Sequence, residues 1–471
     1  MNQWIKLSLL VLVGLSSCQQ RPPRPNIILI MTDDQGWYDA GFNGNPKIQT
    51  PWLDSLAAKG IIFDRFYSAS AVCSPTRASL ITGRNPLRMN IPNANSGHML
   101  AEEITIAEVL KSQNYATGHF GKWHLGTLTQ TELDANRGGR EKFEQHYSIP
   151  TEHGYDRFFC TESKVPTFDP MILPDSFRAG ESKRFGWAVR TEQDSTSAYG
   201  TAYWTGAGKK ETTNLKGDDA RIIMDWVLPF IEDAQQKQQS FFSTIWFHTP
   251  HLPVVSDSLH RAHYSEMELQ KQLYYGTITA LDEQIGRLWQ YLAAEGIEEE
   301  TLIFFCSDNG PERQTPGSAG QFRARKRSLY EGGVRVPAFV LWPGKLVGAK
   351  RVDFPAVTSD YLPTLLEILG LSPQTDRPMD GTSLWDLLLG KESQRNKPIG
   401  FIYGEQISWV DERYKLITTD KTTSFELYDL LNDPAESQNI IEQKPQVAHR
   451  MKAEMMAWLD SVVASQRGDD Y

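Results

Sequence analysis

Asn26-Ile-Ile-Leu-Ile-Met-Thr32, followed directly by Asp33-Asp34-Gln35-Gly36, is the stretch that decides the fold. Its apolar run has the length of one strand and no polar face, which is typical of a central strand buried on both sides. Similar apolar runs recur along the chain at 115–123, 240–247, 301–307 and 336–342. Helical patterns separate most of these runs. This alternation predicts an α/β fold with a large mixed, mostly parallel sheet sandwiched by helices.

The pattern changes near Gly390. Short segments with turn-like gaps predict a small antiparallel sheet, and they lie at 399–403, 407–410, 414–418 and 425–429. A last helix is expected over 445–463. We therefore predict a large domain over 26–390 and a small C-terminal α+β subdomain over 391–471.

Composition excludes one broad class of partner. The 471 residues are 40% hydrophobic, enough for a large core, and the net charge is −10. An acidic chain with a pI of about 5.6 is not expected to bind nucleic acid. An anionic ligand would need Lys, Arg and His side chains gathered at one place.

The N-terminus resembles an export signal. An apolar run ending at Leu15 is too short to span a bilayer and has the length of a signal-peptide core. Leu15-Ser-Ser-Cys18 resembles a lipobox, so we expect a signal peptide over 1–18, lipidation of Cys18 and a tether over 19–25. An ordinary secretory signal is the alternative. Either way we expect export to the periplasm or cell surface, with membrane contact only through the lipid anchor.

Two pairs of residues with oxygen ligands follow buried strands. Asp33 and Asp34 end the first strand, and Asp308 and Asn309 end the strand at 301–307. One such pair alone is more often a turn or a helix cap. Two pairs at the carboxyl edge of one sheet favour a site for Ca²⁺ or Mg²⁺, because both ions prefer oxygen ligands.

A second stretch carries the chemistry: Cys73-Ser-Pro-Thr-Arg77-Ala-Ser-Leu-Ile-Thr-Gly83-Arg84. It predicts a short helix that begins at Cys73 and is ended by Gly83, with Arg77 one turn after the cysteine. Helix N-termini favour anions, so a reactive group suits this place. For an isolated cysteine, simple burial would be the better interpretation.

The whole string resembles the signature of the type I, formylglycine-dependent sulfatases of the alkaline phosphatase superfamily. Gly121-Lys-Trp-His-Leu-Gly126 resembles the second motif of that family, and Glu426 to Pro434 resembles its C-terminal segment. The resemblance spans nearly the whole chain. Within the family, the chain resembles the bacterial polysaccharide sulfatases and arylsulfatases. It implies an alkaline phosphatase-like fold and hydrolysis of sulfate esters.

The resemblance also implies roles for particular residues. A formylglycine-generating maturase would convert Cys73 to formylglycine (3-oxoalanine), the nucleophile once hydrated. One divalent cation, usually Ca²⁺, would be held by Asp33, Asp34, Asp308, Asn309 and the group at Cys73. Arg77, His124 and His251 would be catalytic, and Lys122 and Lys326 would bind the sulfate.

Three of these assignments have competitors. Lys122 and His124 lie two apart on an expected extended segment, so their side chains should share one face, although a Lys-x-His on its own is more often ordinary surface. His248 competes with His251, which we favour because it precedes the x-Pro step. Lys326 is flanked by two arginines, and all three could be solvated loop charge.

Two cysteines are left open by the sequence. Cys160 and Cys306 would form a disulfide in an oxidising compartment or remain buried thiols, and the pattern favours neither.

The expected substrate is a sulfated polysaccharide or oligosaccharide. The alternatives are a phosphonate or phosphate monoester hydrolase or a sulfamidase on the same scaffold, and a non-catalytic glycan-binding lipoprotein. The segment 127–216 has no clear periodicity and is expected to form functional loops. Its aromatic residues are candidates for stacking on sugar rings: Tyr155, Phe158, Phe159, Trp187, Tyr199, Tyr203 and Trp204.

Overall fold

The structure is a computed structural model that describes residues 24–174, 186–189, 197–373, 375–391 and 394–471. The expected signal peptide, Cys18 and most of the tether lie outside the described residues. Within these ranges, no helix combines the length and the apolar character that a membrane crossing requires.

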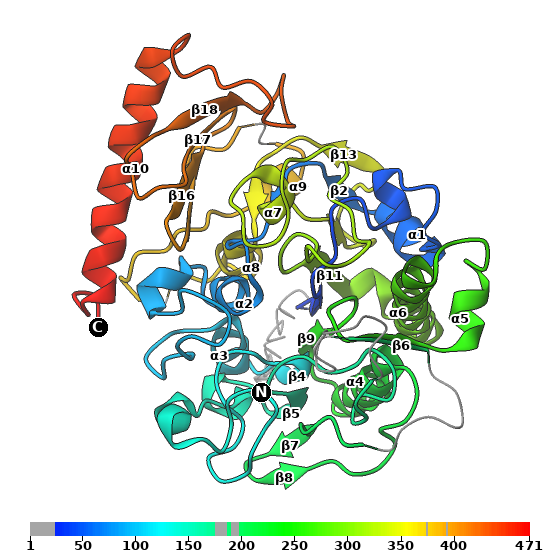
Figure 1. The fold of residues 1–471 in the computed structure, drawn as a ribbon. Coiled ribbons are helices and arrows are strands. Elements are labelled where there is room, and N and C mark those ends of the chain that lie inside the picture. The colour runs from blue at the N-terminus through cyan, green and yellow to red at the C-terminus, as the bar shows by residue number, and fades with distance from the viewer. Residues whose placement is uncertain (1–23, 175–185, 190–196, 374, 392–393) are drawn as a thin grey trace, which may run out of the picture.

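A ten-stranded sheet forms the centre of the molecule (Figure 1). Across the sheet, the strands follow the order β13 (Lys350–Val352), β2 (Ile61–Phe63), β12 (Ala338–Leu341), β11 (Thr301–Ser307), β1 (Asn26–Thr32), β9 (Phe241–Trp246), β4 (Ala116–Lys122), β5 (Arg157–Thr161), β7 (Trp204–Gly206) and β8 (Lys209–Lys210). The five strands from β11 to β5 are parallel, whereas β12 and β7 pair antiparallel to their neighbours. The predicted mixed, mostly parallel sheet is confirmed.

Helices cover both faces of this sheet because alternate side chains of β1 point to opposite sides. Ile27, Leu29 and Met31 belong to one hydrophobic cluster, and Ile28 and Ile30 belong to another. The helices of the first cluster are α2 (Cys73–Thr82), α3 (Ile106–Ser112), α8 (Tyr361–Ile368) and α9 (Trp385–Leu388). Those of the second are α1 (Pro51–Lys59), α4 (Asp219–Gln236) and α6 (Leu269–Ala294).

Smaller elements complete the large body. They are the strand pair β3 (Phe66–Tyr67) and β14 (Ala356–Val357), the pair β6 (Trp187–Val189) and β10 (Val254–Ser256), and the short helices α5 (Ser258–Ala262) and α7 (Glu331–Val334). Residues 61–67 contribute two strands, β2 and β3, which belong to different sheets. The expectation of loops throughout 127–216 is wrong at β5, β7 and β8, which belong to the central sheet, and at β6, which pairs with β10.

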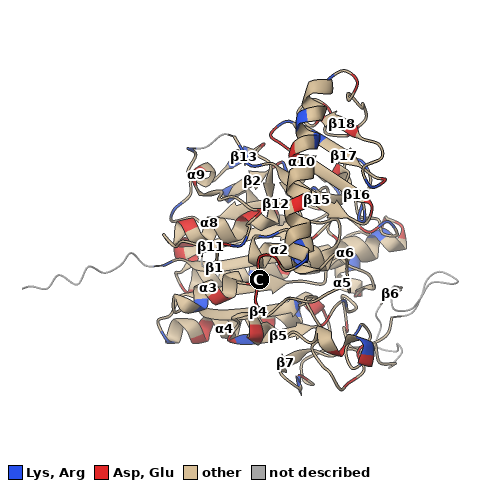
Figure 2. Ribbon diagram, turned by 90° about the vertical axis from the view of Figure 1, so that its left-hand side faces the viewer, with Lys and Arg blue, Asp and Glu red and all other residues tan. Residues whose placement is uncertain are grey.

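A separate antiparallel sheet lies at one end of the molecule, away from β7 (Figures 1 and 2). Its strands are β15 (Ile399–Tyr403), β16 (Gln406–Val410), β17 (Tyr414–Thr418) and β18 (Glu426–Asp429), and α10 (Pro445–Gln466) follows them. One face packs on α10 through Trp409, Leu416 and Met451. The other face packs on the large body, where Phe401 meets Tyr67. The small sheet is confirmed, and the boundary near residue 390 stays a prediction.

A buried ion pair joins the small sheet to the large body. The Lys415 ammonium on β17 donates to Glu331 Oε1 at 3.0 Å and lies 2.9 Å from Glu436 Oε1. All three side chains are buried, and the Tyr67 hydroxyl donates to the second oxygen of Glu331 at 3.0 Å. Burying an ion pair costs desolvation free energy, so removing one partner leaves an uncompensated charge in a poor solvent.

We therefore expect Lys415→Met to lower the free energy of unfolding by about 3 to 5 kcal/mol, since Glu436 loses its cation and Glu331 keeps only Arg335, at 3.3 Å. Urea unfolding followed by intrinsic fluorescence measures the change. Lys391→Met is the matched control, because its side chain is 65% exposed and pairs with Asp386 at 3.3 Å. The control should change stability by about 0.5 kcal/mol or less. Equal effects of the two variants would contradict this account.

Candidate active site

The candidate site lies where the parallel strands end. Asp33 and Asp34 follow β1, Asp308 and Asn309 follow β11, Lys122 ends β4, and His251 follows β9. Parallel strands end at one edge of a sheet, so residues far apart in the sequence meet there. The chain supports this geometry at Gly121, whose φ is 105° and where a Cβ would lie 2.0 Å from the carbonyl oxygen of Trp246. Only glycine fits there without strain.

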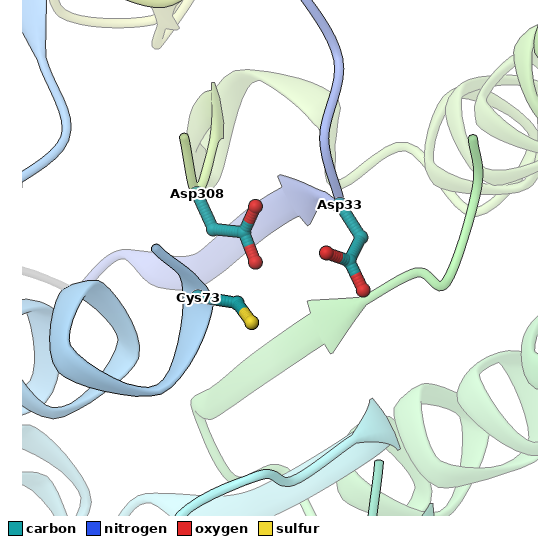
Figure 3. Close-up of side chains that lie close together, drawn as sticks. All are labelled: Asp33, Cys73 and Asp308. Atoms are coloured by element: carbon teal, nitrogen blue, oxygen red, sulfur yellow. The ribbon is translucent and has the colours of Figure 1, made fainter. Parts of the chain in front are cut away.

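Cys73 faces two of the aspartates. Figure 3 shows the thiol, the Asp33 carboxylate and the Asp308 carboxylate pointing toward one another from α2, β1 and β11. One ligand atom from each lies within 4.8 Å of the others, and all three side chains are buried. A second group with the same limit consists of Asp33, Asp34 and His251. The three aspartates therefore lie in one cluster with Cys73 and His251, because Asp33 belongs to both groups.

Two lysines contact the first acidic pair. The Lys122 ammonium donates to Asp33 Oδ2 at 2.6 Å, and the Lys326 ammonium donates to Asp34 Oδ1 at 2.6 Å. Both lysines are almost fully buried. The alternative of a solvated loop charge is therefore wrong for Lys326. Its neighbour Arg325 instead donates to backbone carbonyls, and Arg327 pairs with Glu312.

Arg77 contacts the third carboxylate. Its guanidinium donates to Asp308 Oδ2 through Nη2 at 2.6 Å and through Nε at 3.1 Å. The same group lies 3.7 Å from Asp33 and over the ring of Trp246. As predicted, Arg77 stands one turn after Cys73 on α2, which ends at Gly83 in the left-handed conformation. Three buried carboxylates thus face three buried cations.

This arrangement separates the acidities of the aspartates. Burial opposes ionisation of Asp33, but Lys122, His251 and Arg77 outweigh it and hold the pKa of that carboxyl well below its usual range. At Asp308, burial and the neighbouring charge of Asp33 raise the pKa to about 7. Burial also raises the pKa of the Cys73 thiol. An unconverted Cys73 is therefore a protonated and weakly nucleophilic group.

The oxygen atoms of the cluster fit a divalent cation. Among the described residues, Asp33 Oδ1, Asp34 Oδ2 and Asn309 Oδ1 are buried without a hydrogen-bond partner. Leaving three buried oxygens unsatisfied is costly, and hard cations bind such carboxylate and amide oxygens. Asn309 is held in place because its Nδ2 donates to Asp34 Oδ1 at 2.6 Å. All four predicted oxygen ligands therefore lie together and could hold one ion.

The two competing histidines have different surroundings. His251 Nε2 lies 3.6 Å from Asp34 Oδ2, and its Nδ1 contacts the carbonyl of Leu252. His248 Nδ1 lies 2.8 Å from Asp219 Oδ2, and its Nε2 lies 2.8 Å from Thr161 Oγ1. Both ring nitrogens are therefore engaged in hydrogen bonds. Burial lowers the pKa of His251 to about 4, which keeps that ring neutral near pH 7. The geometry thus favours His251 for the site.

His124 departs from the expected backbone. Its φ is 59°, so the segment is not extended there and the argument from alternating side chains is wrong. The residue still reaches the site, because its backbone N–H donates to the carbonyl of Glu162 at 2.9 Å. Its ring is buried, and burial together with Lys122 holds the pKa of His124 well below its usual range.

Sequence reasoning missed several groups at the site. Ser163 Oγ lies 3.3 Å from His124 Nε2, and Asn95 Oδ1 lies 2.8 Å from the same nitrogen. Burial and the charge of Lys122 lower the pKa of Lys164 to about 8. Tyr403 of β15 also lies within electrostatic reach of Lys326 and Cys73. Recognising β5 would have placed Ser163 and Lys164 here, because both follow its carboxyl end.

The expected sugar-stacking aromatic residues are packing residues instead. All seven side chains are at most 3% exposed, so none presents a ring to a ligand. The seven residues are Tyr155, Phe158, Phe159, Trp187, Tyr199, Tyr203 and Trp204. Phe159 and Tyr203, for example, stack on each other at 4.1 Å between ring centroids. The expectation was wrong because part of the segment belongs to the core. The two remaining cysteines, Cys160 and Cys306, are free thiols and are buried.

Known proteins share this fold and these motifs. The family model described as "Sulfatase" matches residues 25–371, and the one described as "N-sulphoglucosamine sulphohydrolase, C-terminal" matches residues 317–461. The chain is 31% identical to steryl-sulfatase of Rattus norvegicus over 79% of this chain and 72% of that protein. It is 31% identical to arylsulfatase A of Homo sapiens over 92% and 86% of the two chains.

The fold is also similar to that of a solved structure. The crystal structure of Ps i-CgsB in complex with k-i-k-neocarrahexaose is similar with a TM-score of 0.77 and 25% sequence identity, over 93% of each chain. The similarity covers the large body and the small sheet together, so the complete architecture is shared.

Binding of a divalent cation should stabilise the protein, because it satisfies the three unpartnered oxygens. After treatment with EDTA, adding Ca²⁺ or Mg²⁺ at about 100 times its dissociation constant should raise the free energy of unfolding by about 2.7 kcal/mol. Calorimetry measures this as a rise in Tm. Asp33→Ala should abolish the rise, whereas Glu405→Ala, an exposed control on the small sheet, should retain it. Equal rises in all three proteins would show binding elsewhere.

Proposed function

The chain belongs to the sulfatase family, and from this premise we propose that it removes sulfate from a sulfated polysaccharide or oligosaccharide, using formylglycine formed at Cys73 and one divalent cation, Ca²⁺. The observation that carries the proposal is the buried cluster in which Cys73 faces Asp33 and Asp308 within 4.8 Å. A thiol with a raised pKa has little use there. A side chain converted to formylglycine beside a bound cation would serve as the nucleophile.

Formylglycine, if a maturase formed it at Cys73, would supply in its hydrated form the oxygen nucleophile that replaces the alcohol oxygen of the ester on sulfur. Asp33, Asp34, Asp308 and Asn309 would hold the cation, which supplies positive charge beside the sulfate oxygens. Lys122 and Lys326 would bind the sulfate, since cation binding at the carboxylates frees their ammonium groups to face an anion. Arg77 keeps the Asp308 carboxylate oriented through two hydrogen bonds.

Proton movements are assigned to the buried side chains. Lys326, whose pKa Asp34 raises despite burial, stays charged and would stabilise the leaving oxygen together with His251. His124 would receive a proton at one ring nitrogen as sulfate departs, because burial and Lys122 keep its ring neutral beforehand. The burial of these groups excludes water from the reacting centre and strengthens every charge interaction within it.

A glycan substrate is supported by the carbohydrate complex of Ps i-CgsB, whose chain is 25% identical and covered to 93%. A second candidate is a sulfamidase, which cleaves sulfate from nitrogen. It is favoured by one observation, the match of residues 317–461 to the C-terminal model of N-sulphoglucosamine sulphohydrolase. Phosphonate or phosphate monoester hydrolysis is the third candidate reaction, and a comparison of sulfate and phosphate esters distinguishes it from sulfate hydrolysis.

Export and lipid anchoring at Cys18 are also proposed. Their support is the apolar leader and the lipobox-like Leu15-Ser-Ser-Cys18. A surface location would bring the enzyme to large glycans that do not enter the cell.

Cys73→Ala should abolish hydrolysis of p-nitrophenyl sulfate while leaving the Tm of the cation-free protein nearly unchanged, because the variant lacks the precursor of the nucleophile and loses only one small buried sulfur atom. Enzyme co-expressed with a maturase is compared with the variant on sulfate and phosphate esters. Peptide mass spectrometry of Cys73 should show aldehyde in place of thiol. Full activity in enzyme that still carries the thiol would contradict the proposed chemistry. A large phosphate preference in kcat/KM would contradict the proposed reaction.

Among defined compounds, sulfated oligosaccharides should be desulfated with a higher kcat/KM than p-nitrophenyl sulfate, since sugar contacts add binding energy that the small ester lacks. Sulfate release is measured by ion chromatography for O-sulfated and N-sulfated oligosaccharides in parallel. The Cys73→Ala protein controls for contaminating activity. Release from N-sulfated compounds alone would replace the present proposal by the sulfamidase.

A further inference from the structure

We propose that Asn95 is a positioning residue for His124, holding its ring in the tautomer that carries hydrogen on Nε2 and has a free lone pair on Nδ1. Asn95 lies outside the motif that contains His124, in the loop between Asn90 and Gly97. The inference rests on the proposed function, because it specifies how His124 is prepared to receive a proton.

The argument starts at Glu162, directly after β5. Its side chain is buried, and each carboxylate oxygen accepts a backbone N–H: Oε1 from Arg137 at 3.0 Å and Oε2 from Gly138 at 2.9 Å. These donors have no alternative orientation, since a backbone N–H can only donate. Burial and the charge of Asp134 raise the pKa of Glu162 to about 7, so the carboxylate form is present at and above pH 7, and in this form Oε1 faces its next neighbour as an acceptor.

That neighbour is Asn136, whose amide has two possible orientations. Its Nδ2 lies 3.0 Å from Glu162 Oε1 and 2.8 Å from Asn95 Oδ1. If the amide were turned over, its oxygen would face the carboxylate oxygen with no hydrogen between them. Glu162 thus fixes Asn136 with its NH₂ group toward both partners, and each of the two N–H bonds has an acceptor.

The same reasoning then fixes Asn95 and His124. Because Asn136 donates, the Asn95 atom that faces it must be the oxygen, Oδ1. The same oxygen lies 2.8 Å from His124 Nε2, so the ring nitrogen has to be the donor. Hydrogen on Nε2 of a neutral imidazole leaves Nδ1 as the acceptor. Glu162 thus fixes which atom donates and which accepts in each successive hydrogen bond, from Asn136 to Asn95 and then to His124.

The other nitrogen of the ring is the one left for chemistry. Among the described atoms, His124 Nδ1 is buried and has no hydrogen-bond partner. The ring is within electrostatic reach of Lys122, Arg77 and Asp33, all of which belong to the site. A buried lone pair on this nitrogen can receive a proton, whereas an N–H in the same place cannot. The tautomer therefore decides whether His124 acts as a base.

One other contact of the ring does not decide the tautomer. Ser163 Oγ lies 3.3 Å from Nε2 and is a hydroxyl that rotates, so it can donate to the nitrogen or accept from it. Asn95 is the partner whose orientation is fixed by a third residue. Its side chain is exposed, so the competing role for Asn95 is direct contact with a sugar of the substrate.

Nitrogen-15 NMR of the unconverted protein tests the tautomer without any reaction. Histidine is labelled, and the signal of His124 is assigned from its loss in His124→Gln. We expect hydrogen on Nε2 in the wild type and in Asn95→Asp, whose carboxylate still accepts. Asn95→Ala should give a mixture of tautomers. Ser96→Ala, the next residue of the same loop, is the control and should match the wild type.

Steady-state kinetics of the converted enzyme tests the consequence. Asn95→Ala and Asn136→Ala should lower kcat about tenfold or more with little change in KM, as expected when an outer partner of a reacting group is lost. Asn95→Asp should restore most of kcat. A rise in KM alone would assign Asn95 to sugar binding and overturn the proposal, as would an Nδ1–H tautomer in the wild type or an unchanged tautomer or kcat in Asn95→Ala. A wild type without sulfatase activity would instead refute the proposed function.

Discussion

The structure depends on one electrostatic constraint, the balance of buried charge at the carboxyl edge of the central sheet. Asp33, Asp34 and Asp308 cannot be buried together as anions unless cations stand beside them. Lys122, Lys326 and Arg77 meet this requirement at 2.6 Å each, and they come from β4, a loop and α2. The carboxyl ends of β1, β11 and β4, the start of α2 and the loop before α7 therefore meet at one place.

Much of this could be predicted because the signals are local. A buried parallel strand that ends in side chains with oxygen ligands places them at the carboxyl edge of the sheet, so the sequence predicts that Asp33 and Asp308 lie close together. The bounds of β1 and β11 agree with the runs in the sequence for the same reason. The position of Arg77 needed only the period of a helix. Lys326 needed the family resemblance, because nothing local separates it from the arginines on either side.

The remainder depends on tertiary contacts that leave no periodic signal. β5 has five residues and pairs with β4 across a loop of more than thirty, so its burial was not visible in 127–216. The backbone of His124 is left-handed because it bonds to Glu162 after that strand, which local spacing does not reveal. The aromatic residues of the segment were assigned to a surface for the same reason. Asn95 and Asn136 come from two loops whose meeting no motif records.

The Lys415–Glu331 contact makes the last eighty or so residues a partner in the catalytic half of the chain. Glu331 lies five residues after Lys326, so the loop that carries this lysine is anchored on one side by a strand of the small sheet. The C-terminal unit is consequently not a detachable accessory in evolution. Recombination that exchanged the C-terminal unit between relatives would preserve activity only when the loop with Glu331 and the strand with Lys415 were inherited together.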